Sequence, residues 1–198
     1  TTDPSFGRKH LPLLRSRMAE QGLDGFLIPH EDEHQNEYLP QANERLAWAT
    51  GFNGSAGAAV VMTDRAAIFT DGRYTVQVKA QTDPELFERV DLGGLAGYLA
   101  AAPKGAVIGY DPRLHSPDSL DVLKAAAARA GAELKPVDAN PLDLAWGDAR
   151  PAQPQAQVVP HPDRYSGESH ADKRARIGKA IAAAGGDVAL ITAPSSIA

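Results

Sequence analysis

The chain has 198 residues, of which 43% are hydrophobic and 23% are charged, a balance typical of a folded globular protein rather than a disordered one. Its formal net charge of −5 provides no basic surface to neutralise phosphates, so we expect no nucleic-acid partner. It contains no cysteine, which excludes disulfides, thiolate metal sites and cysteine nucleophiles.

A membrane span needs a continuous apolar run of about 18 residues, and the sequence has none of that length. Its first residues also lack the apolar core of a signal peptide. We therefore expect a cytoplasmic protein without a membrane partner.

Apolar residues recur at helical spacing after Asp3-Pro4-Ser5, a segment whose side chains can cap a helix. They are Leu11, Leu14 and Met18. The pattern predicts a helix over residues 5–21 that ends at Gly22. Further helices are expected over residues 43–49, 73–81, 95–101, 120–130 and 167–184.

Short apolar runs between these helices predict strands. They cover residues 25–28, 58–62, 66–70, 86–90, 107–110, 133–137 and 188–191. The runs 58–62 and 66–70 face each other across a three-residue turn, which is typical of an antiparallel hairpin. Strands that alternate with helices indicate an α/β fold with a mixed, mainly parallel sheet and helices on both faces.

The composition changes after residue 147. Residues 148–165 are rich in proline and glutamine and are interpreted as a linker after a first domain of residues 1–147. The pattern of residues 22–28 is echoed by residues 185–191, as a tandem duplication would leave. Residues 166–198 are therefore expected to be the first helix and strand of a second, similar domain, in a chain that is truncated.

His30, Glu31 and His34 form H-E-x-x-H, the signature in which two histidines bind zinc and the glutamate acts as a base. That chemistry needs a helix, whereas this segment follows Pro29 and has acidic residues at both x positions. A solvated acidic loop is the favoured interpretation of this segment. A zinc hydrolase that uses it stays open as a further hypothesis for the function of the chain. His34 is alternatively an anchor for Tyr38 or a substrate contact.

The glycines at positions 51, 54 and 57 suggest a phosphate loop, but the segment runs from helix into strand and has no lysine. Glycines that allow a tight turn are the favoured interpretation. Trp48 and Phe52 are expected in the core rather than as stacking platforms.

Asp71 and Arg73 follow a strand, at the edge where α/β folds place ligands. Asp71 is expected to cap the next helix, and an exposed recognition role for Arg73 stays open. The residues form no Ser/His/Asp or paired-carboxylate set of specific spacing. The sequence therefore assigns no catalytic and no metal-ligating residue.

Four motifs, in their order and spacing, resemble the N-terminal domain of aminopeptidase P, in the three-domain form of these Xaa-Pro aminopeptidases of the creatinase and prolidase superfamily. They are His34-Gln-Asn-Glu37-Tyr38, Arg45-Leu-Ala-Trp48, Thr50-Gly-Phe-Asn-Gly-Ser-Ala-Gly57 and Thr70-Asp-Gly-Arg73-Tyr74. A weaker likeness covers the rest of the chain.

The resemblance implies a protein that removes an N-terminal residue linked to proline. In that family a C-terminal domain outside these residues holds two divalent metals, usually manganese, with a metal-bound hydroxide as the nucleophile. The resemblance also implies a homodimer. It places Glu37, Tyr38 and Arg73 at the substrate entrance or the dimer contact.

We therefore expect a non-catalytic N-terminal region of a metal-dependent Xaa-Pro aminopeptidase, inactive alone, with a role in substrate access and dimer assembly. Its partner would be a peptide with proline in the second position. The alternative is a stand-alone peptide-binding module on the same fold, whose acidic balance suits basic peptides.

Overall fold

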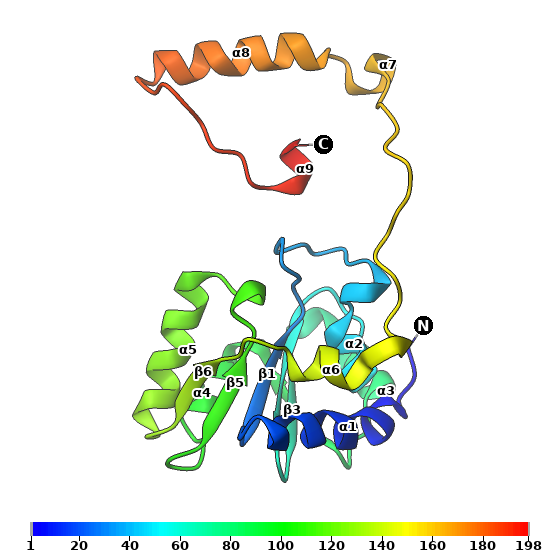
Figure 1. The fold of residues 1–198 in the computed structure, drawn as a ribbon, viewed down its shortest axis with the longest axis vertical. Helices are drawn as coiled ribbons and strands as arrows, with labels where there is room; N and C mark the ends of the chain where they lie inside the picture. Colours follow the sequence, from blue (N-terminus) through cyan, green and yellow to red (C-terminus); the bar gives the residue numbers. More distant parts are fainter. Residues whose placement is uncertain (1, 198) are drawn as a thin grey trace. The chain divides into compact units, whose positions relative to one another are not determined.

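The computed structural model describes residues 2–197. The chain divides into two compact units, Thr1–Gln153 and Pro154–Ala198. The first unit carries a sheet with helices around it, whereas the described residues of the second form helices and no strand (Figure 1).

The first unit is built on one six-stranded sheet. Its strands are β1 (Gly25–Pro29), β2 (Gly57–Met62), β3 (Ala66–Thr70), β4 (Phe87–Asp91), β5 (Val107–Tyr110) and β6 (Glu133–Pro136). They lie in the order β4-β3-β2-β1-β5-β6. β2 is antiparallel to both β1 and β3, whereas the other three neighbouring pairs are parallel. The predicted mixed, mainly parallel α/β sheet is confirmed, including its hairpin.

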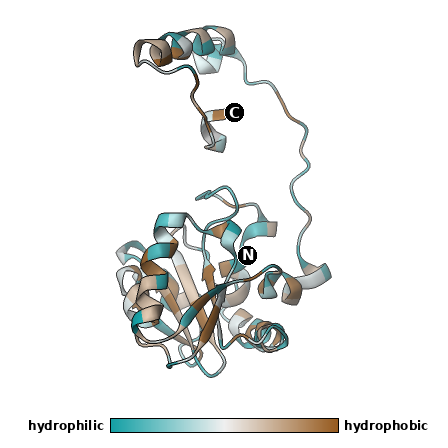
Figure 2. Ribbon diagram, turned by 60° about the vertical axis from the view of Figure 1, so that its left-hand side comes forward, coloured by the Kyte–Doolittle hydropathy of each residue, from teal (hydrophilic) through white to brown (hydrophobic). Residues whose placement is uncertain are grey.

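Helices cover both faces of this sheet (Figure 1). They are α1 (Phe6–Glu20), α2 (Arg45–Thr50), α3 (Thr75–Gln81), α4 (Leu95–Leu99), α5 (Pro117–Arg129) and α6 (Pro141–Trp146). Successive side chains of a strand point to opposite faces. Phe26 of β1 therefore shares a buried cluster with Leu14 of α1, while Leu27 shares the other with Leu123 of α5. The inner strands of the sheet consist mainly of buried hydrophobic residues (Figure 2).

The ends of α1 show how local residues set its bounds. Gly22 follows the helix with φ of 66°, the left-handed conformation that ends many helices, as predicted. At the other end, the segment Asp3-Pro4-Ser5 was expected to supply capping side chains, and within the described residues the Ser5 side chain makes no capping bond. Asp3 Oδ1 instead accepts a hydrogen bond from the Ser5 amide at 2.9 Å, which closes the turn before the helix.

Sequence reasoning missed α6, although its start has clear signals. Asn140 Oδ1 accepts hydrogen bonds from the amides of Leu142 and Asp143, and Pro141 is the first helical residue. An asparagine cap followed by proline is a typical helix start. The helix has only 6 residues, too few to show an amphipathic period.

The second unit differs from prediction in two ways. The expected helix over residues 167–184 begins later, as α8 (His170–Ala183), after a short α7 (Asp163–Ser166) that ends at Gly167. The predicted strand 188–191 is wrong, because those residues adopt no regular structure, and the last described helix is α9 (Pro194–Ile197). A strand needs a partner for its backbone N–H and C=O groups, and the described part of this unit provides none.

Candidate functional site

A pocket of about 650 Å³ lies beside the loop of residues 30–42, the start of β2 and the turn after β3. Glu37, Tyr38 and Arg73, the three residues expected at a substrate entrance, all line it. The other lining residues are His30, Leu39, Glu44, Asn53, Gly54, Ser55, Tyr74 and Gln77. Three separate segments of the chain thus meet at one polar surface, which we call the entrance pocket.

A short chain of hydrogen bonds crosses the entrance pocket. Ser55 Oγ donates to Glu37 Oε1 at 3.0 Å, and Tyr74 Oη lies 2.8 Å from the same hydroxyl. Because the Ser55 hydroxyl has a single proton, Tyr74 is the donor to Ser55. The Glu37 carboxylate is therefore held toward β2 and keeps an acceptor oxygen for a ligand.

Arg73 is oriented by the turn in which it lies. The Asp71 carboxylate accepts bonds from the Arg73 amide at 2.9 Å and from Nη2 at 2.7 Å, which confirms Asp71 as a cap. Hydrogen bonds from Arg73 lower the pKa of Asp71 below its ordinary value. The guanidinium carbon also lies 5.2 Å from the centre of the Tyr74 ring. With 62% of its side chain exposed, Arg73 presents a fixed positive charge to solvent.

Tyr38 stands free at the rim, with 85% of its surface exposed. The expected alternatives for His34, an anchor for Tyr38 or a substrate contact, gain no support from its position. His34 is not among the residues that line the pocket, and its amide donates to Asp32 Oδ1 at 3.0 Å. His30 is the histidine that does line it, and its Nε2 lies 2.9 Å from the carbonyl oxygen of Glu37.

The five residues of the H-E-x-x-H motif form no helix. His30 follows the last residue of β1, and His34 lies in a turn, so the facing pair that zinc proteases use is not formed. Asp32, which sequence reasoning passed over, organises this loop from a buried position. Its carboxylate accepts hydrogen bonds from the amides of His34 and Asn36 and from the side chain of Asn43. Burial raises its pKa, but these bonds outweigh burial and lower it overall.

Arg45 is the second residue that sequence reasoning missed. Its side chain is 2% exposed, yet it carries a full charge at the start of α2. Nη2 contacts Glu33 Oε1 at 2.8 Å, and the guanidinium forms two bonds with Asp143, whose other charged contact is Arg150. Burial lowers the pKa of Arg45, but the hydrogen bonds that it donates to Asp143 and Glu33, together with their negative charges, raise it overall. The sequence did offer one indication of this role, because Arg45 is followed by the apolar residues of a predicted helix.

The glycine-rich segment has the structural role that its sequence favours. Gly51 follows α2 with φ of 87°, and a Cβ placed there would lie 2.4 Å from the carbonyl oxygen of Gln81 and 2.6 Å from that of Asp3. Only glycine permits both the left-handed backbone and this approach. The segment therefore packs α2 against α3 and the chain start rather than cradling a phosphate.

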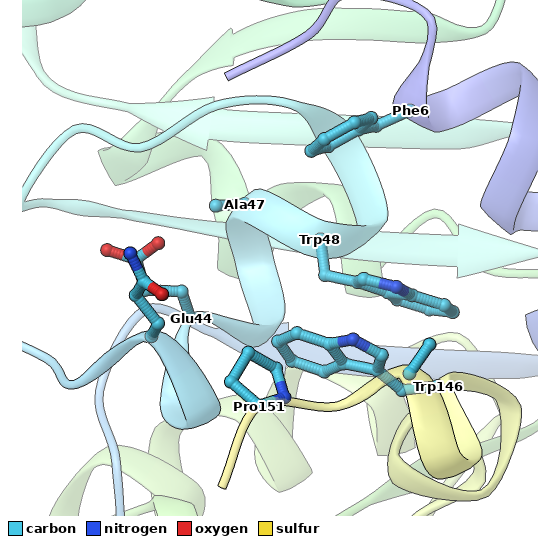
Figure 3. Close-up of a pocket in the computed structure, with 8 residues that line it drawn as sticks. Phe6, Glu44, Ala47, Trp48, Trp146 and Pro151 are labelled. Atoms are coloured by element: carbon cyan, nitrogen blue, oxygen red, sulfur yellow. The ribbon is translucent and has the colours of Figure 1, made fainter. Parts of the chain in front are cut away.

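Trp48 and Phe52 are core residues, as predicted, since they are 8% and 0% exposed. The Trp48 ring stacks on His10 at 4.2 Å and on Trp146 of α6 at 5.5 Å. Figure 3 shows the two indole rings one above the other, with Pro151 beside them. They line a second pocket, of about 220 Å³, which we call the aromatic pocket.

No group of three or more histidine, cysteine, aspartate or glutamate residues within residues 2–197 is placed to hold a metal ion. The side chains in this part of the chain thus do not fit a dinuclear metal centre. In the same part of the chain, each helix is too short or too polar to cross a membrane.

Two sequence models of one family match the chain in tandem. A model described as the creatinase/prolidase N-terminal domain covers residues 11–143, and a second model with the same description covers residues 149–198. This tandem match agrees with the internal echo in the sequence.

The curated relatives are aminopeptidases. The chain is 38% identical to Xaa-Pro aminopeptidase 2 of Sus scrofa over 170 residues, which is 84% of this chain and 25% of the relative. It is 35% identical to a probable Xaa-Pro aminopeptidase P of Coprinopsis cinerea over 195 residues, 96% of this chain and 31% of that one. The chain therefore spans about a quarter to a third of the length of these relatives.

Solved structures of peptidases also match the chain. An X-prolyl aminopeptidase from Caenorhabditis elegans, described as a cytosolic enzyme with a di-nuclear active site, matches with a TM-score of 0.81 and 26% identity. The match covers 96% of this chain and 34% of that one. The N-terminal domain of the cytoplasmic peptidase PepQ from Mycobacterium tuberculosis matches with a TM-score of 0.55 and 26% identity, over 69% of this chain and 98% of that one. The chain belongs to the creatinase/prolidase N-terminal domain family.

Proposed function

We propose that the chain is the non-catalytic N-terminal region of a metal-dependent Xaa-Pro aminopeptidase, in which it shapes substrate access and takes part in dimer assembly. The observation that carries this proposal is the likeness to the Caenorhabditis elegans enzyme, which extends over 96% of this chain but only 34% of that protein. The groups that cleave the peptide, including two divalent metals expected to be manganese, would lie in the remaining part.

In this proposal residues 1–147 are the first domain, 148–165 the linker and 166–198 the beginning of a second, similar domain. The tandem family matches, over residues 11–143 and 149–198, support two domains, and the second match includes the linker residues. A cytoplasmic location is supported by the description of the Caenorhabditis elegans enzyme as cytosolic.

The entrance pocket has the chemistry to contact a peptide with proline in its second position. Arg73 offers charged donors to a peptide carbonyl oxygen, and Glu37 offers an acceptor to a peptide amino group. The exposed ring of Tyr38 provides an apolar face on which a proline ring can pack. In this proposal the three side chains bind and orient the peptide.

The first test uses the purified chain and the tripeptide Ala-Pro-Ala with added manganese. We expect no release of alanine, because the described residues hold no dinuclear site. Metal-dependent turnover by the pure chain would overturn the proposal.

The second test uses the longer protein and the substitution Arg73→Gln. We expect KM for Ala-Pro-Ala to rise about threefold to tenfold, with a smaller change in kcat, because the loss is one charged hydrogen bond made at binding. The matched control is Arg113→Gln. Arg113 forms the same turn with Asp111 after β5 as Arg73 forms with Asp71 after β3, but it does not line the pocket. Equal effects of both substitutions would argue against a role of the entrance pocket.

The dimer part of the proposal is tested separately, by light scattering of the longer protein after size-exclusion chromatography. A mass of two chains is expected, and a monomer would remove that part alone. The alternative, a peptide-binding module without catalysis, would be favoured if the isolated chain bound a basic peptide while the longer protein showed no metal-dependent turnover.

A further inference from the structure

A third cavity, of about 220 Å³, lies between the end of β1, the start of β2 and the start of α5. Its walls are largely apolar, and Leu27, Leu95 and Leu123 are among the residues that form them. We call it the leucine pocket. It belongs to neither the entrance pocket nor the aromatic pocket, since it shares no lining residue with them.

The leucine pocket lies where α/β folds place their ligands. β1 and β5 are parallel neighbours, and the lining residues Pro29 and Leu114 lie at or beyond their carboxyl ends. Small-molecule sites are typically apolar hollows with a few polar groups, placed at this edge of the sheet. The cavity is smaller than the roughly 300–1,000 Å³ of sites for drug-sized ligands, so it suits a molecule of few atoms.

His115 is one of the polar residues that line the leucine pocket. Its Nε2 is fully buried and has no hydrogen-bond partner within the described part of the chain. An unpartnered buried polar atom destabilises the fold, and a bound molecule that supplies the missing hydrogen bond would recover that loss. The ring is fixed edge-on to Tyr110, with centres 5.8 Å apart.

Burial lowers the pKa of His115 to about 4, despite the nearby Asp111 carboxylate. The imidazole is therefore neutral at pH 7 and can donate or accept one hydrogen bond. It offers no positive charge to an anion.

The charged residues around the leucine pocket restrict the charge of the ligand that it can bind. Glu31 is the one carboxylate among its described lining residues, and none of these residues is a lysine or an arginine. An anionic ligand would bring a second negative charge beside Glu31, whereas a neutral or cationic one would not.

We propose that the leucine pocket binds a small organic molecule with an apolar body, one hydrogen-bonding group and no negative charge, and that His115 Nε2 makes the hydrogen bond. This site is independent of the proposed peptidase function. It needs only the first unit, so its failure and the failure of the peptidase proposal are distinguishable.

The test is a titration of the ¹⁵N-labelled chain with benzyl alcohol, benzylamine and benzoate, which share one ring and differ in charge. We expect benzyl alcohol and benzylamine to shift the amides of Ala58, His115 and Ser119 with dissociation constants on the order of 1 mM, the range for so few atoms. Benzoate should bind at least about tenfold more weakly, because its carboxylate faces Glu31.

Substitutions then locate the binding. His115→Phe keeps an aromatic ring but removes the hydrogen bond, and should weaken benzyl alcohol binding about fivefold to tenfold. Ala58→Leu and, at the rim, Ser119→Leu fill the leucine pocket and should abolish binding. Ala149→Leu fills the aromatic pocket, which has the same volume, and should leave benzyl alcohol binding unchanged.

Two variants fill the pocket, so that one remains if the other does not fold. The chemical-shift dispersion in the same spectra shows whether each variant is folded. Three outcomes would overturn the proposal. They are the absence of saturable shifts, which indicates a pocket filled by water only, shifts that survive both filling variants, and tighter binding of benzoate than of benzyl alcohol.

Discussion

Arg45 on α2 and Asp143 on α6 form a two-bond ion pair although they are 98 residues apart in the sequence. The pair joins the helix before the hairpin to the last helix of the first unit. Asp143 also contacts Arg150, and Arg45 contacts Glu33 in the loop of the entrance pocket. One buried charge thus connects three segments that carry or support the site.

Asp143→Asn should strongly destabilise the first unit. The substitution leaves the 2%-exposed Arg45 with Glu33 as its one remaining carboxylate partner, and breaking a buried ion pair costs about 3–5 kcal/mol. Urea unfolding followed by circular dichroism measures the loss. The control is Asp148→Asn, an exposed aspartate of the neighbouring segment, which should change the free energy of unfolding by less than about 0.5 kcal/mol. Similar effects of the two substitutions would contradict a structural role of the pair.

Gly51→Ala should cost at least about 3 kcal/mol of stability. The left-handed backbone accounts for about 1–2 kcal/mol, and the contacts of the new Cβ with two carbonyl oxygens add the rest. Gly105 separates the two terms, because its φ of 82° is similar but its Cβ position is open. Gly105→Ala should therefore cost about 1 kcal/mol. Thermal unfolding measures both, and equal losses would show that the close approach at Gly51 carries no energy.

Stability should fall between pH 6.5 and pH 4 because of His115. Its ordinary pKa is 6.5, and burial lowers it to about 4 in the folded chain, so the unfolded chain binds the proton first as the pH falls. The stability that His115 contributes is complete above pH 6.5 and is lost toward pH 4, by at most about 3 kcal/mol. His115→Phe should flatten this part of the pH profile of urea unfolding. A pH profile of His115→Phe that matches that of the parent chain would refute the assignment to His115.

Backbone amides of α8 should exchange hydrogen at least roughly 100-fold faster than those of α1. The two helices have 14 and 15 residues, but α1 buries a face and, within the described structure, α8 buries no residue. Exposed apolar side chains at Val188 and Leu190 show the same lack of packing. Hydrogen exchange followed by mass spectrometry compares both helices in one sample, and equal protection would show that α8 is stabilised by contacts not described here.

The sheet of the first unit was predictable because its strands are apolar runs with turns between them, as in the pair 58–62 and 66–70. The strand expected at 188–191 failed for the opposite reason, because its apolar pattern is real but no described neighbour pairs with it. Patterns along a chain report local preference, and pairing depends on residues elsewhere.

The site was predictable only in part. The resemblance indicated Glu37, Tyr38 and Arg73, and the structure places all three at the entrance pocket. Asp32 and Arg45, which organise and anchor the loop beside the pocket, were missed. Asp32 accepts hydrogen bonds within an irregular loop that shows no sequence period, and Arg45 pairs with Asp143, 98 residues away. A charged side chain that becomes buried leaves no periodic pattern in the sequence by which it could be recognised.

The end of the first unit is bonded to the loop that carries the entrance pocket. Gln153 Nε2 donates to Asn43 Oδ1 at 2.8 Å, and Arg150 Nε donates to the carbonyl oxygen of Ala42 at 2.7 Å. Asn43 in turn donates to Asp32, the centre of the loop. A shortened gene product that stopped after α6 would lose both anchors, so the smallest version of this unit that preserves the loop has to extend through Gln153.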